Sequence, residues 1–218
     1  MIPGKKDAID RKYRALIEGN YSPIPRDADE KIIDNIISVA ELAMDKKQPL
    51  NAVLEQAAKL IFRHFDFREV GVGLKSRTTN TYKYEVLLGY RPDIVDSLRK
   101  LEYTHEDMVS QDRFPNIKTG RLSELNPVEG LPEEEKTLFN RPYQLTVMRE
   151  SSDDFHEGDY LDIWMYGPNK ELIGWFELSN PINRKLPPRR MIRWIELIAS
   201  LCSSIVIQRW AEGGPATR

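Results

Sequence analysis

The last quarter of the chain changes its hydrophobic period once, from two residues to about 3.6. Alternation over Leu161–Tyr166 resumes over Leu172–Ser179 after the turn GPNKE, which is the pattern of a β-hairpin. Pro187 and Pro188 cannot continue a central strand, but they suit the first turn of a helix. Apolar residues then recur at helical spacing from Met191 onward. This order predicts an antiparallel hairpin that leads into a long core helix.

The region before this hairpin predicts helices first and another hairpin after them. Apolar residues at helical spacing indicate three helices, over 5–18, 27–44 and 50–64. From Phe67 the period becomes two, and the polar turn SRTTNT separates that strand from a second one, YKYEVLLGY. This order of elements favours an α+β domain with an antiparallel sheet over a parallel α/β fold.

The segment after the first hairpin has weaker patterns. PDIVDSLRKLEY is expected to form a helix. The insert 102–150 is polar and interrupted by prolines, so loops with short elements are expected there, with QLTVMRE as a further strand. No internal repeat or low-complexity tract divides the chain, and 218 residues suit one domain with additional helices.

The composition excludes several classes of protein. With 40% apolar and 30% charged residues the chain resembles a globular protein, and its net charge of -2 gives no general attraction to nucleic acid or anionic membranes. No apolar run approaches the roughly 20 residues that span a bilayer, and the N-terminus lacks the apolar stretch of a signal peptide. Its one cysteine, Cys202, cannot form an internal disulfide. A cytoplasmic protein without nucleic-acid or membrane partners is expected.

The last helix has a wider apolar surface than one sheet can cover. Its apolar residues occupy more than half of the circumference, whereas a helix on one sheet needs an arc of about 100°. Either the helix expected over 27–44 or a second copy of the chain covers the remainder, and both alternatives are open. The apolar positions are Met191, Ile192, Trp194, Ile195, Leu197, Ile198, Ala199, Leu201, Cys202, Ile205 and Val206.

The closing run, residues 173–208, resembles the end of a GAF domain. In that family a strand with an inner glycine is followed by an Asn/Asp-Pro turn, a Lys/Arg-Pro stop and a helix with a Leu-Glu-x-x-Ala pattern. The resemblance extends over residues 48–210. The matching positions here are Ile173-Gly174, Asn180-Pro181, Lys185 to Pro188, and Ile195-Glu196 through Ala199 to Ile205.

The resemblance implies a fold and a function. It implies a central antiparallel sheet of five or six strands, with the N- and C-terminal helices packed on one face and a small-molecule pocket on the other. GAF domains sense a ligand and pass a signal through their terminal helices, often as homodimers, to a signalling partner protein. The implied division is an N-terminal helical extension over 1–47, a GAF domain over 48–210 and a disordered tail over 211–218.

Three departures from family patterns narrow this function. No kinase, cyclase, phosphodiesterase or helix-turn-helix segment is recognised. No cysteine lies in the pocket region, which disfavours a covalently attached bilin and methionine-sulfoxide reduction. The Asn-Lys-Phe-Asp-Glu signature of cyclic-nucleotide-binding members is not readable either. We therefore expect a non-catalytic sensor without a cofactor, whose ligand the sequence does not name.

Strand alternation locates the expected pocket. If Val70, Val72 and Leu74 face the helices, then Gly71 and Gly73 face the other side, where a missing Cβ leaves space. Arg113 from the insert would suit an anionic ligand. The alternative is that the tryptophans fill this space as a second core, which would make the protein an interaction and dimerisation scaffold. The predicted ligand-binding residues are Gly71, Gly73, Tyr84, Tyr103, His105, Arg113, Trp164, Tyr166, Trp175 and Glu177.

Two charged clusters and the possible nucleophiles allow other interpretations. The acidic cluster could hold a divalent metal and support a small enzyme, but its spacing fits no established ligand loop, so a solvated loop is favoured and no metal site is expected. The basic residues at the start of the last helix could meet an acidic partner or an anion, although a solvated face is favoured. Three histidines and Cys202 follow no known catalytic order, so no catalytic residues are expected. The acidic cluster is Asp153, Asp154, His156, Glu157, Asp159 and Asp162, and the basic residues are Arg184, Lys185, Arg189, Arg190 and Arg193.

Overall fold

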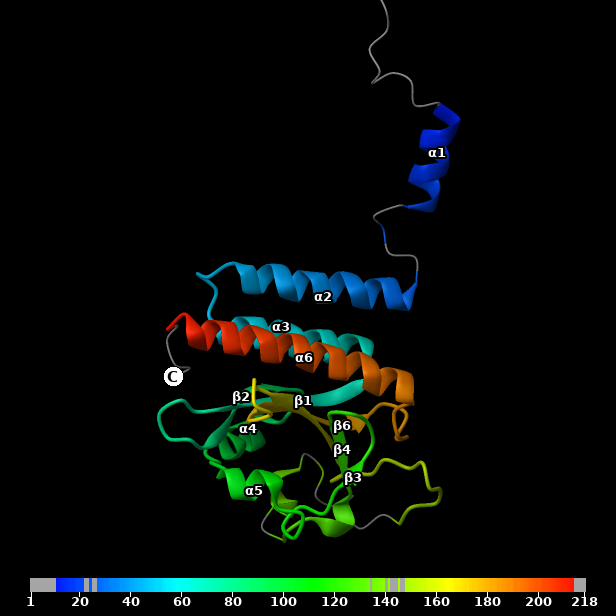
Figure 1. Ribbon diagram of the computed structural model, residues 1–218. Coiled ribbons are helices and arrows are strands. Elements are labelled where there is room, and N and C mark those ends of the chain that lie inside the picture. Colours follow the sequence, from blue (N-terminus) through cyan, green and yellow to red (C-terminus); the bar gives the residue numbers. More distant parts are fainter. Residues whose placement is uncertain are drawn as a thin grey trace, which may run out of the picture.

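A six-stranded antiparallel sheet, in the order β2-β1-β6-β5-β4-β3, organises the chain (Figure 1). The structure is a computed structural model and describes residues 11–21, 24, 27–133, 135–139, 141, 145 and 148–213. Its elements in chain order are α1 (Arg11–Asn20), α2 (Ala28–Met44), α3 (Leu50–His64), β1 (Phe67–Lys75), β2 (Tyr82–Leu88), α4 (Pro92–Leu98), α5 (His105–Val109), β3 (Ile117–Lys118), β4 (Ser123–Asn126), the short 3-10 helices η2 (Val128–Gly130) and η3 (Lys136–Leu138), β5 (Tyr160–Tyr166), β6 (Leu172–Pro181) and α6 (Arg189–Ala211).

Two hairpins form four neighbouring strands of the sheet, as the alternating patterns predict. β1 pairs with β2 and β5 pairs with β6, both antiparallel. β1 and β6 also pair with each other, so that Gly73 lies opposite Trp175 and Val72 lies opposite Phe176. The predicted α+β fold with five or six antiparallel strands is confirmed.

Helices α2, α3 and α6 form a helical layer on one side of the sheet (Figure 1). α3 and α6 contact the strands, and α2 packs over these two helices. Their apolar side chains share one core with alternate strand residues, among them Val70, Val72 and Leu74 of β1 and Leu161 and Ile163 of β5. The prediction that this face of the sheet packs against the helices is confirmed.

Capping residues and prolines set the starts of these helices near the predicted positions. Asp27 precedes α2, and its carboxylate accepts a hydrogen bond from the backbone N–H of Glu30 at 2.9 Å. Pro49 and Pro188 are the residues immediately before α3 and α6. The proline pair therefore ends the preceding segment and directly precedes the long helix, as its fixed φ favours.

Two predicted helices differ in length from the observed ones. The helix expected over 92–103 ends at Leu98. The chain then turns so that Tyr103 forms a β-bridge with the start of β2, which a continued helix would prevent. Of the helix expected over 5–18, residues 5–10 lie outside the described part of the chain, and α1 covers Arg11–Asn20.

The wide apolar surface of α6 is covered in part by the chain itself. Ile32 and Val39 of α2 are buried in the core to which α6 contributes. Leu197 of α6 is still 51% exposed, and on α2 Ile33 and Ile37 are 43% and 49% exposed. Exposed apolar side chains therefore remain on both α2 and α6 after α2 has packed on the layer.

α6 is long and apolar enough to span a membrane by length and composition, contrary to the prediction that no segment reaches this limit. Its window of highest hydropathy has a mean of 1.4, but 50% of that window is buried inside the molecule. Ile195, Ala199 and Cys202 belong to the core under the helical layer.

The insert 102–150 has more regular structure than its sequence indicates. β3 and β4 extend the sheet beyond β5, although they comprise only 2 and 4 residues. Thr104 and Asp107 form a capping box at the start of α5. Of QLTVMRE, residues 144, 146 and 147 lie outside the described residues, and the other four are not in a strand. Residues 214–218 of the predicted tail also lie outside the described residues.

Candidate functional site

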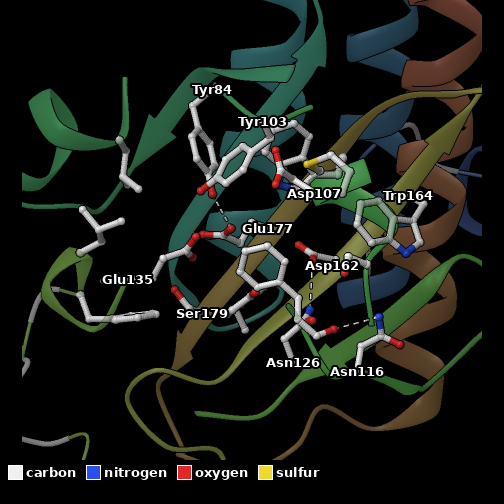
Figure 2. Close-up of a pocket in the computed structure, with 18 of the residues that line it drawn as sticks. Tyr84, Tyr103, Asp107, Asn116, Asn126, Glu135, Asp162, Trp164, Glu177 and Ser179 are labelled. Carbon is white, nitrogen blue, oxygen red and sulfur yellow. Dashed lines mark hydrogen bonds between the residues drawn. The ribbon is translucent and has the colours of Figure 1, made fainter. Parts of the chain in front are cut away.

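The face of the sheet opposite the helical layer carries a cavity (Figure 2). Residues of β2, β4, β5 and β6 line it from the sheet, and residues of α4, α5 and the segment around η3 line it from the insert side. It is narrow, with about 60 Å³ of room for the centres of water molecules. Since one water needs roughly 10–15 Å³ on this measure, the cavity holds a few waters or a small ligand.

Aromatic rings form the wall of the cavity nearest to β1. The ring centroids of Tyr84 and Trp175 lie 5.1 Å apart, and those of Tyr103 and Trp175 lie 6.3 Å apart. A Cβ built on Gly73 would lie 2.0 Å from the Trp175 indole, and one on Gly71 would lie 3.1 Å from the Tyr84 ring. The space expected above the two glycines is therefore occupied by these aromatic side chains.

Two carboxyl groups face the cavity from neighbouring strands, that of Asp162 buried and that of Glu177 half-buried. Asp162 of β5 and Glu177 of β6 lie directly opposite each other in the strand register (Figure 2). Glu177 accepts hydrogen bonds from the hydroxyl groups of Tyr84 at 2.5 Å and Tyr90 at 3.1 Å. Asp162 accepts one from the side-chain amide of Asn126 at 2.9 Å. These contacts orient both carboxyl groups within the cavity.

The environment raises the pKa of both carboxyl groups. Loss of hydration is the main cause, and it raises the pKa of Asp162 well above its usual range and also raises that of Glu177. Repulsion from Glu177, Glu124 and Glu135 raises the pKa of Asp162 further, whereas the hydrogen bond from Asn126 lowers it. Both groups therefore hold a proton more tightly than ordinary carboxyl groups do.

Five of the predicted ligand-binding residues line the cavity, and the others lie beneath or beside it. His105 and Tyr166 line an adjoining open groove. Arg113 forms an ion pair with Asp107 and lies 3.8 Å from Glu135, so its charge is matched by protein carboxylates. Gly71 and Gly73 lie under the aromatic wall. The five lining residues are Tyr84, Tyr103, Trp164, Trp175 and Glu177.

Several lining residues are absent from the sequence-based set. Strand alternation places Asp162 on the same side as Trp164, so an acidic residue in a predicted strand was a usable signal for it. Ser179 follows from the same alternation in β6. Asn126 and Glu135 come from the insert, where no periodicity predicts the direction of a side chain.

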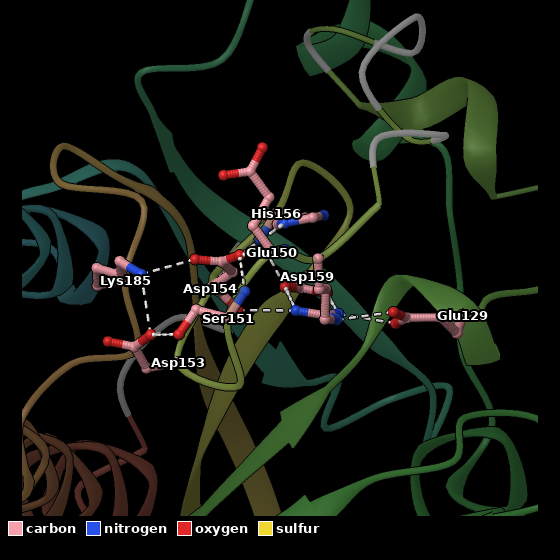
Figure 3. Close-up of polar contacts among 9 residues, drawn as sticks. Glu129, Glu150, Ser151, Asp153, Asp154, His156, Asp159 and Lys185 are labelled. Carbon is pink, nitrogen blue, oxygen red and sulfur yellow. Dashed lines mark hydrogen bonds and ion pairs between the residues drawn. The ribbon is translucent and has the colours of Figure 1, made fainter.

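The acidic cluster is held by ion pairs within the chain (Figure 3). Arg149 donates hydrogen bonds to both carboxylate oxygens of Asp159, at 2.7 and 2.8 Å. Lys185 Nζ lies 2.9 Å from Asp153 and 2.7 Å from Asp154. The solvated-loop interpretation is wrong for Asp159, which is completely buried. Across the described ranges, no group of three His, Cys, Asp or Glu residues is arranged to hold a metal ion.

The basic residues at the start of α6 also have partners within the chain. Arg190 forms an ion pair with Asp29 of α2. Arg193 lies 2.6 Å from the buried carboxylate of Glu196, which also accepts the backbone N–H of Leu122 at 2.7 Å. These contacts join α6 to α2 and to the segment before β4, so at least part of the basic cluster stabilises the fold.

The possible nucleophile and bases lie in separate environments. Cys202 is buried in the core under the helical layer, and loss of hydration raises the pKa of its thiol to about 12. A buried thiol with this pKa is not a nucleophile near neutral pH. The imidazoles of His64, His105 and His156 instead lie next to Asn35, Tyr82 and Asp154, respectively.

Comparison with known proteins identifies the fold through structure alone. No family model and no curated protein matches the sequence. A GAF domain/HD domain protein from Geobacter sulfurreducens matches with a TM-score of 0.54 and 11% identity, over 79% of this chain and 98% of that chain. The GAF domain of a phosphoenolpyruvate-protein phosphotransferase from Coxiella burnetii matches with a TM-score of 0.54 and 12% identity. This match covers 86% of this chain and 99% of that chain.

A longer protein contains a similar unit. The bacteriophytochrome RpBphP3 from R. palustris matches with a TM-score of 0.52 and 17% identity, over 86% of this chain and 39% of that chain. At such identities the similarity concerns the arrangement of the sheet and helices and not the ligand. The chain has the fold of a GAF domain.

Proposed function

We propose that this protein is a GAF-type regulatory domain that senses a small molecule in signal transduction and has no catalytic activity of its own. The observation that carries the proposal is the cavity, which lies on the face of the sheet opposite the helical layer. Aromatic walls with a few convergent polar groups are the usual form of a small-ligand site. The shared fold adds support by analogy only.

Strand β6 offers a physical connection between the cavity and the helical layer. Trp175 and Glu177 line the cavity, whereas Phe176 and Leu178 of the same strand belong to the core under the helices. β6 also precedes α6 directly in the chain. A ligand that shifts the cavity side chains would thereby change how β6 packs under α6, which is a route for a signal.

Ligand-dependent stability tests this function. The purified protein is heated with a panel of nucleotides and metabolites, and native mass spectrometry of the fresh sample searches for a co-purified molecule. A bound compound should raise the free energy of unfolding by RT ln(1 + [L]/Kd). If no compound raises the melting temperature and only the bare chain is detected, the sensory function is refuted.

An interaction scaffold is the second candidate function. Its supporting observation is the narrowness of the cavity, because Trp175 and Tyr84 occupy the space over Gly73 and Gly71. A scaffold should retain its stability and its partners irrespective of small molecules. The thermal panel therefore separates the two functions.

We also propose that the domain forms a cytoplasmic homodimer through the apolar surface of its helical layer. Ile33 and Ile37 of α2 and Leu197 of α6 are exposed there. The dimer would bury these side chains and carry the signal to a partner protein. Its cytoplasmic location is proposed because the only cysteine is an unpaired, buried thiol.

Sedimentation tests the dimer. Ile37→Glu places a charge on the apolar surface and should shift the protein to a monomer, since an unpaired charge cannot be buried cheaply. Ser38→Glu, at an exposed neighbouring position of α2, is the matched control and should remain dimeric. A wild-type protein that sediments as a monomer at high concentration would contradict the proposal.

A further inference from the structure

The cavity has several acidic side chains and, among the described residues that line it, no basic one. Asp162 and Glu177 are cross-strand neighbours, and Asp107 and Glu135 also line the space. Arg113 forms ion pairs with Asp107 and Glu135, which line the cavity. It forms none with Asp162 or Glu177. Like charges directly opposite each other destabilise a sheet, so this arrangement calls for a compensating positive charge or a proton.

Asp162 has an oxygen with no hydrogen-bond partner among the described residues. Its Oδ2 atom accepts the hydrogen bond from Asn126 at 2.9 Å. Within the part of the chain that the structure describes, its Oδ1 atom accepts none, although the residue is only 6% exposed. A buried acceptor without a donor is costly, and this one belongs to a residue that lines the cavity. A donor in the cavity would satisfy it.

The other walls suit a positive charge as well. Tyr84, Tyr103 and Trp175 approach one another edge to face, and Trp164 lines the same space from β5. The faces of such rings attract cations, most strongly where water is excluded. Aromatic rings combined with ionisable carboxyl groups are therefore complementary to an organic cation and not to an anion.

We propose that the cavity binds a small organic cation with an ammonium or guanidinium group, which donates a hydrogen bond to Asp162 Oδ1 and lies among the aromatic rings. This inference names the ligand class of the sensory site and rests on the function proposed above. The cavity volume of about 60 Å³ corresponds to roughly four to six waters, which limits the ligand to a few heavy atoms unless the rings move. It also replaces the anionic ligand expected from Arg113, whose charge is already matched.

The competing explanation is that protons alone neutralise the carboxyl groups. Burial raises the pKa of both, so the empty site retains protons to a higher pH than usual. A cation that binds must displace a proton, and its affinity should therefore rise with pH. The titratable groups that act on Asp162 in this balance are Glu124 of β4, Glu135 before η3, Glu177 of β6, and the tyrosines Tyr103 and Tyr160.

Calorimetric titration of the full chain tests the inference. The probes are propylammonium, guanidinium and tetramethylammonium chlorides, with propanol and sodium propionate as neutral and anionic controls, at constant ionic strength. At least one cation should bind, several-fold more tightly at pH 8 than at pH 6, and neither control should bind.

Two charge-removing variants locate the site. Asp162→Asn keeps the size of the side chain and should weaken cation binding at least tenfold. Asp96→Asn removes the same charge from an exposed position on α4 and should leave the affinity unchanged. Circular dichroism and a melting curve verify that both variants are folded.

The outcomes separate this inference from the proposed function. Equal cation affinity in the wild type and Asp162→Asn overturns the inference. It is also overturned if no cation binds while the metabolite panel yields a neutral or anionic ligand, and the sensory function then remains. Both proposals fail if neither series binds and the fresh protein contains no small molecule. A cationic ligand from the panel whose binding Asp162→Asn weakens supports both.

Discussion

Replacing Gly73 with alanine would test the aromatic wall of the cavity. A Cβ at this position would lie 2.0, 2.1 and 2.5 Å from three atoms of the Trp175 indole, so the indole has to move. Trp175 is only 2% exposed, and its ring contacts those of Tyr82, Tyr84 and Tyr103 at centroid distances between 5.1 and 6.5 Å. The indole can therefore move only by displacing these tyrosine rings or by entering the narrow cavity that it lines.

The expected magnitude follows from two opposing effects. Overpacking a buried site costs about 1–3 kcal/mol, and three clashing atoms favour the upper half of that range. Alanine in a strand recovers roughly 0.5–1 kcal/mol of backbone entropy relative to glycine. The free energy of unfolding should therefore fall by about 2 kcal/mol, and at ~2–4 °C per kcal/mol for a chain of this length the melting temperature should fall by ~4–8 °C.

Gly71→Ala is the matched control, because the same gain in backbone entropy meets a much weaker clash. Its Cβ would lie 3.1 and 3.3 Å from two atoms of the Tyr84 ring, contacts that a small ring rotation relieves. Urea unfolding gives the stability of both variants, and near-ultraviolet circular dichroism reports on the packing of the aromatic rings. Only Gly73→Ala should lose stability by more than about 1 kcal/mol and change the aromatic spectrum.

The reasoning would be refuted by equal stabilities of the two variants together with an unchanged aromatic spectrum. That result would mean that the Trp175 indole does not lie over Gly73. The shape assigned to the cavity would then be wrong, because this indole forms one of its walls.

Three further predictions concern buried charge. Arg149→Leu should lower the free energy of unfolding by roughly 3 kcal/mol in urea titrations, because Asp159 is left buried without its cation. The control Lys46→Met, at an exposed ion pair, should change this free energy little. Equal losses of stability in the two variants would contradict this reasoning. Because the pKa of Asp162 is raised in the folded state, the folded chain binds more protons than the unfolded chain above pH ~4. The free energy of unfolding of the wild type should therefore fall with rising pH relative to that of Asp162→Asn. Parallel plots of this free energy against pH for the two proteins would disprove the raised pKa. Cys202 should react with a thiol reagent at pH 8 only after unfolding, because burial raises the pKa of its thiol to about 12. Rapid reaction of the native protein would place Cys202 at the surface.

Local patterns in the sequence predicted most of the sheet and the helical layer. Alternation in β1 assigned Val70 and Val72 to the helical side, because successive side chains of a strand point to opposite faces. Asp27 and the proline pair before α6 marked helix starts through backbone constraints that act over a few residues. These features depend on neighbours in the chain, so the sequence alone suffices to predict them.

The content of the cavity depended on contacts between distant residues. Alternation placed Gly73 and Trp175 on one side of the sheet, but only the strand register puts them opposite each other, with the indole over the glycine. The pairing of Asp162 with Glu177 arises from the register of β5 and β6 in the same way.

The sequence by itself therefore determined the type of the main helices and of the two hairpins, and the face on which the residues of these hairpins lie, because φ, ψ and side-chain direction are local properties. Only the tertiary structure decided that Arg113 pairs with carboxylates, that α2 covers part of α6, and that acidic and aromatic side chains meet in one cavity. These outcomes depend on packing and charge between segments far apart in the chain, for which a single sequence has no periodic signal.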